Sequence, residues 1–292
     1  MPIVSASPCA TTEASRTNPA KELRQRIDGH IEALANAVDD VRASDDFRRY
    51  LDVQARFHSY SWHNCMLIFM QRQDATRVAG YRAWQKLGRQ VRKGERGIRI
   101  LAPCPFKRER ATADGESETV KGMFFRAVSV FDVGQTDGDA LPSVDVPTID
   151  SAADDLLARL TRVAVSRDIA LAFQPVSGGA FGVSKRGAIE IDNQHPAGQQ
   201  AKMLAHELAH EALHWNIKGP FTRSLAELEA EAVAYLVCRH FGLDTEVRSS
   251  RYIALWQGDA KSMRESLERI ATTARSIIDD ASAPAESRKA VA

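Results

Sequence analysis

Residues 205–210 read Ala-His-Glu-Leu-Ala-His. They lie in a longer segment, residues 199–215, whose apolar positions predict a helix that is buried on one side. On a helix, residues four apart lie on the same face, so His206 and His210 can both reach one metal ion. Neutral imidazole nitrogens suit Zn²⁺, which in catalytic sites takes three protein ligands and keeps a position open for water. The stretch therefore predicts a zinc site on a buried helix.

The remaining groups of a hydrolytic zinc site are also present in the sequence. Glu207 follows the first histidine and can remove a proton from a metal-bound water as general base. The third ligand has to come from another helix, and the helix predicted over residues 224–241 offers Glu227 and Glu231 on one face. Either glutamate can bind the metal while the other orients a ligating histidine, and we expect Glu227 to be the ligand. Glu229 points away from that face and is expected on a solvated surface.

Two further features lie near this motif. His214 follows His210 by one helical turn. It either stabilises the oxyanion of a tetrahedral intermediate or forms an ordinary hydrogen bond to a neighbour. Residues 187–192, Gly-Ala-Ile-Glu-Ile-Asp, alternate in the manner of a strand. This strand is either an edge that can pair with an extended peptide substrate or an ordinary sheet strand.

The composition is that of a soluble globular protein. Apolar residues make up 44% and charged residues 26% of the 292 residues, a length that favours two ordinary domains. No apolar run is long enough for a transmembrane helix, and the N-terminal segment lacks the pattern of a secretory signal. The cysteines are scattered, at Cys9, Cys65, Cys104 and Cys238, which argues against a disulfide framework. We therefore expect a cytoplasmic protein with no membrane partner.

The N-terminal half predicts helices followed by a small antiparallel sheet. Apolar residues at helical spacing predict one helix over residues 21–42, a second that is capped by Ser44, and a third over residues 62–70. Strand and turn signals then predict the following features: a hairpin of residues 89–91 and 98–101 around a turn at 93–97, a polar loop over 108–119, and a second strand pair within 122–133.

The C-terminal half starts after a segment rich in Asp, Pro, Gly and Ser, residues 134–150, which we interpret as a linker. The predicted elements beyond it are a helix over 150–163, a strand over 169–173, a glycine-rich turn at 177–179, the strand at 187–192, and helices over 199–215, 224–241 and 259–280. Both halves are of the α+β class. The sequence thus predicts a short lead-in at 1–20, a first domain at 21–133, a linker at 134–150, a second domain at 151–280 and a flexible tail at 281–292.

The first domain contains a basic segment. Between Arg77 and Arg110 there are eleven cationic residues and two acidic ones, with aromatic residues interleaved or close by. Cations that follow a phosphate backbone, together with aromatic faces for bases, are typical of proteins that bind single-stranded nucleic acid. The alternative is a solvated hairpin whose tryptophans lie in the core. On the first interpretation the DNA-binding residues are Trp62, Asn64, Tyr81, Arg82, Trp84, Arg89, Arg92, Lys93, Arg96 and Arg99.

The first domain resembles the N-terminal single-stranded-DNA-binding domain of ArdC-type antirestriction proteins. The matching residues are Tyr60 to Asn64, Leu67-Ile68, Gly80 to Trp84, Leu87-Gly88, Val91, Lys93 to Glu95 and Ile98 to Pro103. The second domain is similar to the zincin-type metallopeptidase half of the same proteins, which is related to ImmA/IrrE-type peptidases, at residues 206–210, 227–231 and 234. In those relatives the metal ligand opens an E-x-x-A segment, which corresponds to Glu227, and Asn often stands where this chain has Glu231.

The resemblance, which covers roughly residues 21–278, implies a zinc-dependent metallopeptidase of the gluzincin-like HExxH type, coupled to a domain that binds single-stranded DNA. The implied partners are single-stranded DNA and a protein or peptide substrate. The implied role is antirestriction, the protection of incoming plasmid or phage DNA. Two other functions fit the same residues. One is a non-catalytic DNA shield or restriction-enzyme blocker with a structural zinc, and the other is an ImmA-like peptidase that cleaves a repressor.

Overall fold

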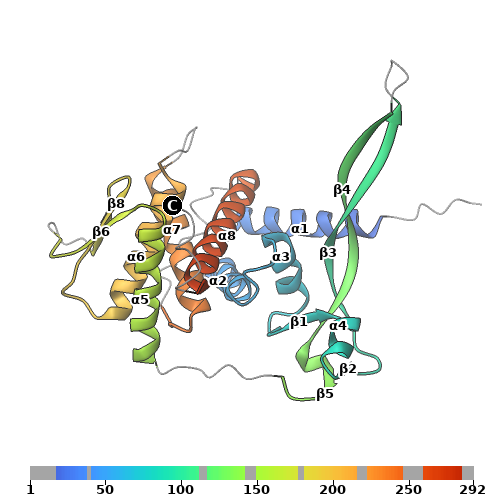
Figure 1. Cartoon of the computed structure of the whole chain (residues 1–292). Helices are drawn as coiled ribbons and strands as arrows, with labels where there is room; N and C mark the ends of the chain where they lie inside the picture. The colour runs from blue at the N-terminus through green and yellow to red at the C-terminus, as the bar shows by residue number, and fades with distance from the viewer. Residues whose placement is uncertain are drawn as a thin grey trace, which may run out of the picture.

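The computed structural model describes residues 18–37, 41–111, 117–141, 149–176, 181–215, 222–245 and 259–284. The chain is of the α+β class, as predicted (Figure 1). Its helices are α1 (Pro19–Asn36), α2 (Val41–Arg56), α3 (Trp62–Gln71), α4 (Tyr81–Lys86), α5 (Ile149–Ser166), α6 (Ala197–Leu213), α7 (Arg223–His240) and α8 (Ala260–Ser282). Its strands are β1 (Val78–Gly80), β2 (Arg89–Val91), β3 (Ile98–Ala111), β4 (Ser117–Asp132), β5 (Thr136–Gly138), β6 (Ala170–Phe173), β7 (Gly182–Ser184) and β8 (Ala188–Ile191), with a 3₁₀ turn, η1, at Val133–Gln135.

The first helices follow the predicted apolar spacing but begin and end elsewhere. The side chain of Asn18 caps α1 by accepting a hydrogen bond from the Ala20 N–H, and Pro19 occupies the first turn, where its missing N–H costs nothing. The predicted cap at Ser44 is wrong, because α2 begins at Val41 and Ser44 lies inside it. Helix α1 ends at Asn36, earlier than the predicted 42.

A long two-stranded ribbon dominates the first half. Strands β3 and β4 pair antiparallel in one unbroken register from Ile98–Val130 to Ala111–Ser117, and β1 adds to the base of β4. We call this β3–β4 ribbon the arm, because Figure 1 shows it projecting away from the helices. The predicted hairpin between residues 89–91 and 98–101 is therefore wrong. Residues 98–101 belong to β3, which pairs with β4, and residues 89–91 form β2, which pairs with β5.

The predicted loop at residues 108–119 is also corrected at its ends. Residues 108–111 continue β3 and residues 117–119 open β4, so only residues 112–116, which lie outside the described residues, remain for the connection. The linker likewise begins later than predicted. Residues 134–138 belong to η1 and β5, which close the first half, and residues 142–148 are outside the described part of the chain.

The second half contains a three-stranded sheet that lies beside α5 and α6. The strand order is β6-β8-β7, with β6 parallel and β7 antiparallel to β8. Of the two interpretations of residues 187–192, the edge strand is therefore wrong and the ordinary sheet strand is confirmed, because β8 is paired on both sides. The edge strand next to α6 is β7, which is three residues long and gave no clear signal in the sequence. The predicted turn at 177–179 lies outside the described residues.

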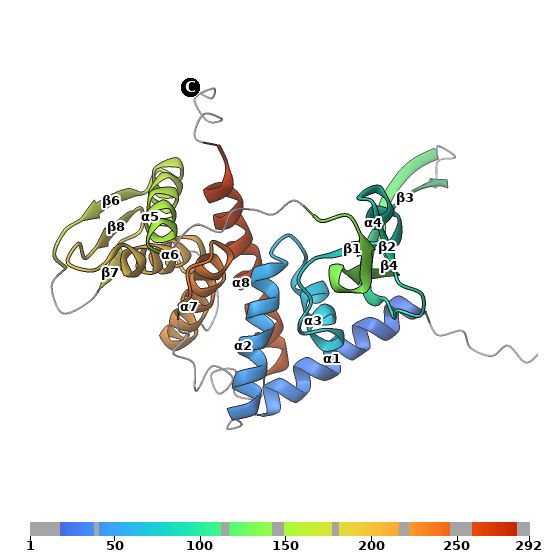
Figure 2. The same cartoon turned by 90° about the horizontal axis from the view of Figure 1, so that it is seen from below.

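The two halves share one continuous apolar core, so their predicted separation into two domains is not confirmed. Helix α2 packs on α7, and α8 packs on α1 as well as on α5 and α7 (Figure 2). Polar contacts join the same elements: the Tyr235 hydroxyl donates to Asp52 at 2.5 Å, and the Arg264 Nε lies 3.2 Å from Asp28. The position of one half therefore constrains the other.

No helix among the described residues is long and apolar enough to cross a membrane. The described cysteines, Cys65, Cys104 and Cys238, are free. Burial raises the pKa of the Cys238 thiol to about 12, so that thiol stays protonated and unreactive.

Candidate metal centre

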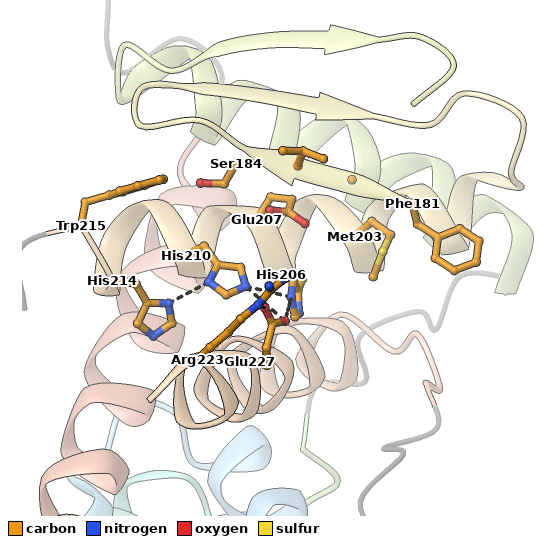
Figure 3. A pocket seen from close by; sticks show the side chains of 12 residues that line it. Phe181, Ser184, Met203, His206, Glu207, His210, His214, Trp215, Arg223 and Glu227 are labelled. Atoms are coloured by element: carbon orange, nitrogen blue, oxygen red, sulfur yellow. Dashed lines mark hydrogen bonds and ion pairs between the residues drawn. The ribbon is translucent and has the colours of Figure 1, made fainter. Parts of the chain in front are cut away.

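Helices α6 and α7 bring the three predicted ligands together. The Nε2 atoms of His206 and His210 lie 3.0 Å apart, one helical turn along α6. The Oε2 of Glu227, on α7, lies 3.4 Å from the His206 Nε2 and 3.6 Å from the His210 Nε2. One ligand atom from each residue lies within 4.8 Å of the other two, a spacing that fits a single ion held by all three (Figure 3).

Glu227 is the third member of this group. A hydrogen bond with His206 lowers the pKa of Glu227 to about 2, against the opposing effect of burial, so its carboxylate is ionised and ready to bind a cation. The backbone of α7 delivers it to this position. The Thr222 side chain caps that helix by accepting a hydrogen bond from the Leu225 N–H. The other faces of the helix carry buried side chains between residues 225 and 238, which fix it in the core. We therefore identify His206, His210 and Glu227 as the residues that can hold the metal.

Glu231 lies on the outer side of the same histidine. Its Oε2 is 3.6 Å from the His206 Nδ1, while its Oε1 accepts from the Lys202 ammonium at 2.7 Å. Burial raises the pKa of Glu231, but hydrogen bonds from His206 and Lys202 outweigh it and the net shift is downward. A carboxylate on the far nitrogen of a ligating histidine fixes the ring and its tautomer. This geometry is consistent with the predicted arrangement in which Glu227 is the ligand and Glu231 orients His206.

Glu207 points away from the ligands and toward strand β7 (Figure 3). Its side chain is buried and accepts a hydrogen bond from the Ser184 backbone N–H. Gly182 leaves room for it, since a Cβ at that position would lie 3.2 Å from the Cγ and Oε1 of Glu207. Burial raises the pKa of Glu207 to about 7, opposed by the charge of His206. A carboxylate with this pKa is suited to accept and release a proton near neutral pH.

A second chain of contacts runs outward from His210. Its Nδ1 lies 2.8 Å from the Nδ1 of His214, and the His214 Nε2 lies 3.5 Å from the Oε2 of Glu229. Glu229 is fully buried and accepts from the Ser266 hydroxyl at 2.6 Å and from the Arg269 guanidinium, both on α8. The predicted solvated position of Glu229 is therefore wrong, because α8 covers that face of α7.

The metal ligands open into a pocket of about 460 Å³ between α6, α7 and β7. Its walls combine the ligands with Glu207 and β7 on one side and exposed aromatic rings at its ends. Phe181 is 43% exposed and Trp215 is 41% exposed, so both are available to a ligand that lies along the pocket (Figure 3). The sequence did not indicate β7 or these rings, because only the tertiary fold brings them to the motif.

Three of the predicted DNA-binding residues serve the core instead. Trp62 and Trp84 are 3% and 2% exposed, and the Trp84 indole N–H donates to the Phe131 carbonyl at 2.8 Å. The amide of Asn64 exchanges hydrogen bonds with both backbone groups of Leu101, at 2.9 Å each, and so joins α3 to β3. The prediction that these side chains contact DNA is wrong for the fold described, because no face of them is open.

Two of the predicted arginines hold the small β2–β5 sheet. The Arg89 guanidinium donates to the hydroxyl and carbonyl of Thr136, at 2.8 and 2.9 Å. Arg92 pairs with Glu95 and Asp137, at 2.9 and 3.3 Å. The remaining predicted DNA-binding residues lie on the surface of the first half: Tyr81, Arg82, Lys93, Arg96 and Arg99.

Known proteins match this chain in two ways: one family model matches the sequence of its first half, and solved structures match its fold. Residues 17–131 match the family model of the N-terminal domain of anti-restriction factor ArdC. The chain is ArdC-like. Two crystal structures of the antirestriction protein ArdC from plasmid R388 have the same fold: the metal-free form with a TM-score of 0.50 at 21% identity, and the Mn(II)-bound form with 0.51 at 19% identity. They cover 75% and 88% of this chain and 82% and 96% of the ArdC chains.

Two curated relatives are described as uncharacterized proteins. The chain is 24% identical to the uncharacterized protein pXO2-81 of Bacillus anthracis over 89% of its own length and 50% of that protein's. It is 26% identical to the uncharacterized protein y4eC of Sinorhizobium fredii over 68% of both chains. This ArdC-like chain thus spans about half the length of the first relative.

Proposed function

We propose that this chain is a zinc-dependent metallopeptidase that also binds single-stranded DNA and acts in antirestriction. The observation that carries the proposal is the convergence of two imidazoles and a carboxylate, with ligand atoms within 4.8 Å, beside a buried glutamate. Two histidines and a glutamate are a ligand set used by catalytic zinc, which keeps a further position open. The Mn(II)-bound form of the R388 ArdC protein supports a divalent metal in this fold.

The chemistry is divided between the metal and the side chains around it. Bound zinc supplies a Lewis acid and lowers the pKa of its water to about 7. Glu207 lines the same pocket as the three ligands and would serve as the general base toward such a water and as the proton donor to the leaving amine, roles that fit its raised pKa. Glu231 and His214 hold the rings of His206 and His210 from behind.

Strand β7 offers a binding edge for the peptide. Among the described residues it pairs with β8 on one side only, and Ser184, at its end, donates its backbone N–H to Glu207. An extended chain that adds to the free edge would run past Glu207 and the metal ligands between Phe181 and Trp215. Backbone pairing of this kind selects for an unfolded or flexible segment of a protein substrate.

The antirestriction role rests on the first half of the chain. Its match to the ArdC N-terminal domain covers residues 17–131, and its surface carries exposed cations such as Lys93, Arg96 and Arg99. The net charge of the whole chain is nearly neutral, +1, so these cations make the surface of the first half locally positive. A locally positive surface favours a polyanionic partner on that half. Single-stranded DNA that enters a cell during conjugation is such a partner.

Metal content and a base variant test the enzyme. We expect about one zinc per chain in the purified protein, and the His206→Ala variant should lose it. The parent chain should hydrolyse casein, measured with and without single-stranded DNA. The Glu207→Gln variant should keep its zinc but lose this hydrolysis. Glu265→Gln, an exposed glutamate on α8, is the matched control and should behave as the parent chain. A folded parent chain without metal, or full hydrolysis by Glu207→Gln, would contradict the proposal.

A further inference from the structure

The arm carries large apolar side chains that the core does not use. Phe106, Met123, Phe124 and Phe125 are 41%, 56%, 49% and 39% exposed. Contiguous exposed apolar side chains are rare on monomeric proteins and mark interaction sites. They lie on a ribbon that projects from the helices (Figure 1), so a ligand can approach it without obstruction.

The strand register gathers two of these rings on one face. Phe106 pairs with Gly122, and Phe124 pairs with Cys104, so the two rings are diagonal neighbours with centroids 6.2 Å apart. A Cβ on Gly122 would lie 2.4 Å from the Phe106 ring, which shows that the ring lies directly across the glycine. Shielding of a strand glycine explains Phe106 alone. The exposed Phe124 beside it extends the apolar surface beyond that need.

The middle of the arm, residues 98–107 and 119–131, carries only positive charges, while Glu109, Glu118 and Asp132 lie toward its two ends. On the face opposite to Phe106 and Phe124, Lys107 and Lys121 are directly across from each other in the register, a like-charge pair that destabilises a ribbon in isolation. Arg126 is exposed two residues beyond Phe124, and residues 98–107 and 119–131 contain no Asp or Glu. On the other face the Arg24 guanidinium lies 4.9 Å from the centroid of the Phe125 ring. A polyanion would neutralise this arrangement.

We propose that the arm is the surface on which single-stranded DNA lies, with bases stacked on Phe106 and Phe124 and a phosphate beside Arg126 on the same face, while Lys107 and Lys121 on the opposite face add to the positive charge of the ribbon. The inference rests on the DNA-binding part of the proposed function and gives it a location. It assigns the stacking role to phenylalanines of the arm in place of the buried tryptophans. The rings are inclined to each other by 48°, so each presents its own face to a base.

Fluorescence anisotropy with a labelled oligothymidine of 20 nucleotides tests the arm on the full chain. Aromatic stacking contributes enough per base that Phe106→Ala/Phe124→Ala should weaken binding about tenfold or more. Arg126→Ala should reduce the slope of log K against log salt by about one unit, because Arg126 is exposed on the same face as the rings. Phe173→Ala is the matched control, since this phenylalanine is 37% exposed on β6 in the other half and should leave binding unchanged.

The outcomes separate the two proposals. A parent chain that does not bind the oligonucleotide contradicts the DNA-binding function itself. Parent binding that survives in Phe106→Ala/Phe124→Ala overturns the arm alone. If the parent chain self-associates, and Phe106→Ala/Phe124→Ala abolishes this association but leaves DNA binding intact, the rings form a contact with a second copy of the chain and the arm proposal is overturned. Phe106→Leu/Phe124→Leu keeps an apolar cover over Gly122, so loss of binding there supports stacking even if the alanine variant unfolds.

Discussion

The Nδ1 of His210 lies 2.8 Å from the Nδ1 of His214. Two imidazole nitrogens at this distance share one proton, so one ring donates and the other accepts. The ionised Glu229 carboxylate only accepts, and therefore places the His214 proton on Nε2, which leaves its Nδ1 free to accept from His210. The His210 Nε2 would then present a lone pair to a bound metal. A buried glutamate that does not touch the metal thus sets the tautomer of a metal ligand.

Replacement of His214 should weaken metal binding without loss of the fold. In His214→Phe the His210 Nδ1 has no acceptor, and outer partners of metal ligands typically change affinity by about 10–100-fold. Cobalt titration of the metal-free chain, followed by absorption, measures both the affinity and the ligand geometry. His214→Gln, whose carbonyl can accept from His210, should recover part of the affinity.

A double-mutant cycle tests whether Glu229 acts through His214. Glu229→Gln should weaken cobalt binding in the parent chain and have no further effect in His214→Phe. The control is Asp280→Asn. Asp280 lies on α8 and forms an ion pair with Arg167 at 2.8 Å, so its replacement removes an ion pair but should leave the cobalt affinity unchanged. Equal, additive losses from Glu229→Gln and His214→Phe would mean that Glu229 acts only on the stability of the fold.

Gly182→Ala should impair hydrolysis and leave the metal in place. The new Cβ would lie 3.1 Å from Ile191 Cδ1 and 3.2 Å from the Glu207 carboxylate, so Glu207 or β7 must shift by a few tenths of an ångström. Catalysis is sensitive to such shifts of a general base, while the ligands are untouched. Zinc content and kcat should be measured together with Gly198→Ala, where the nearest contact is an ordinary 3.6 Å.

Metal removal should lower the thermal stability of the chain. The ligands come from two helices, so a metal that binds only the folded chain stabilises it, by about 2.7 kcal/mol at a free concentration of 100 times Kd. Calorimetry should show a lower Tm after EDTA treatment, restored by zinc. His206→Ala should show neither response, and an equal EDTA effect on that variant would point to a different metal site.

Asp132→Ala should destabilise the base of the arm by about 3 kcal/mol. The Asp132 carboxylate accepts from the backbone N–H groups of Thr76, Arg77 and Gly134, at 2.7, 3.0 and 2.8 Å. Burial raises its pKa, but these bonds outweigh it and the net pKa is lowered, so their stabilisation is lost as pH falls below the usual 3.8. Urea unfolding measures the loss, with the exposed Asp137→Ala as the near-neutral control.

Stability should also fall when the pH drops below about 6.5, because of two histidines where α2, α7 and α8 meet. Burial lowers the pKa of both His58 and His240, whose rings lie 4.3 Å apart, despite the charge of Asp279 near both. Arg275 lowers the His58 pKa further. The unfolded chain therefore binds more protons near pH 6, which favours unfolding. His240→Phe should flatten the dependence of Tm on pH between 5 and 7, and an unchanged slope would contradict this assignment.

The sequence predicted most of the site because the site depends on helical spacing. The four-residue separations of His206 from His210 and of Glu227 from Glu231 placed each pair on one face, and the helices formed as expected. What it missed depends on neighbours that are distant in the chain. Glu229 was expected in solvent because its partner Arg269 lies forty residues away on α8.

Strand pairing was predicted less well than the helices for a related reason. Residues 89–91 and 98–101 are separated by a short turn, which favours a local hairpin, yet the fourteen-residue register of β3 with β4 determines the sheet. The tryptophans of the basic segment were ambiguous from composition, since aromatic rings serve both cores and stacking surfaces. Only burial distinguishes Trp84 from Phe124.

Helix α8 has a consequence for how the chain is made. It packs on α1 of the first half and on α5 and α7 of the second, with Arg264 reaching Asp28. During translation the described elements before α8 leave the ribosome first, so one face of α1 lacks its α8 partner until α8 has been made. Completion of the core that the two halves share therefore depends on this late element, and we expect a nascent chain interrupted before α8 to leave that core incomplete.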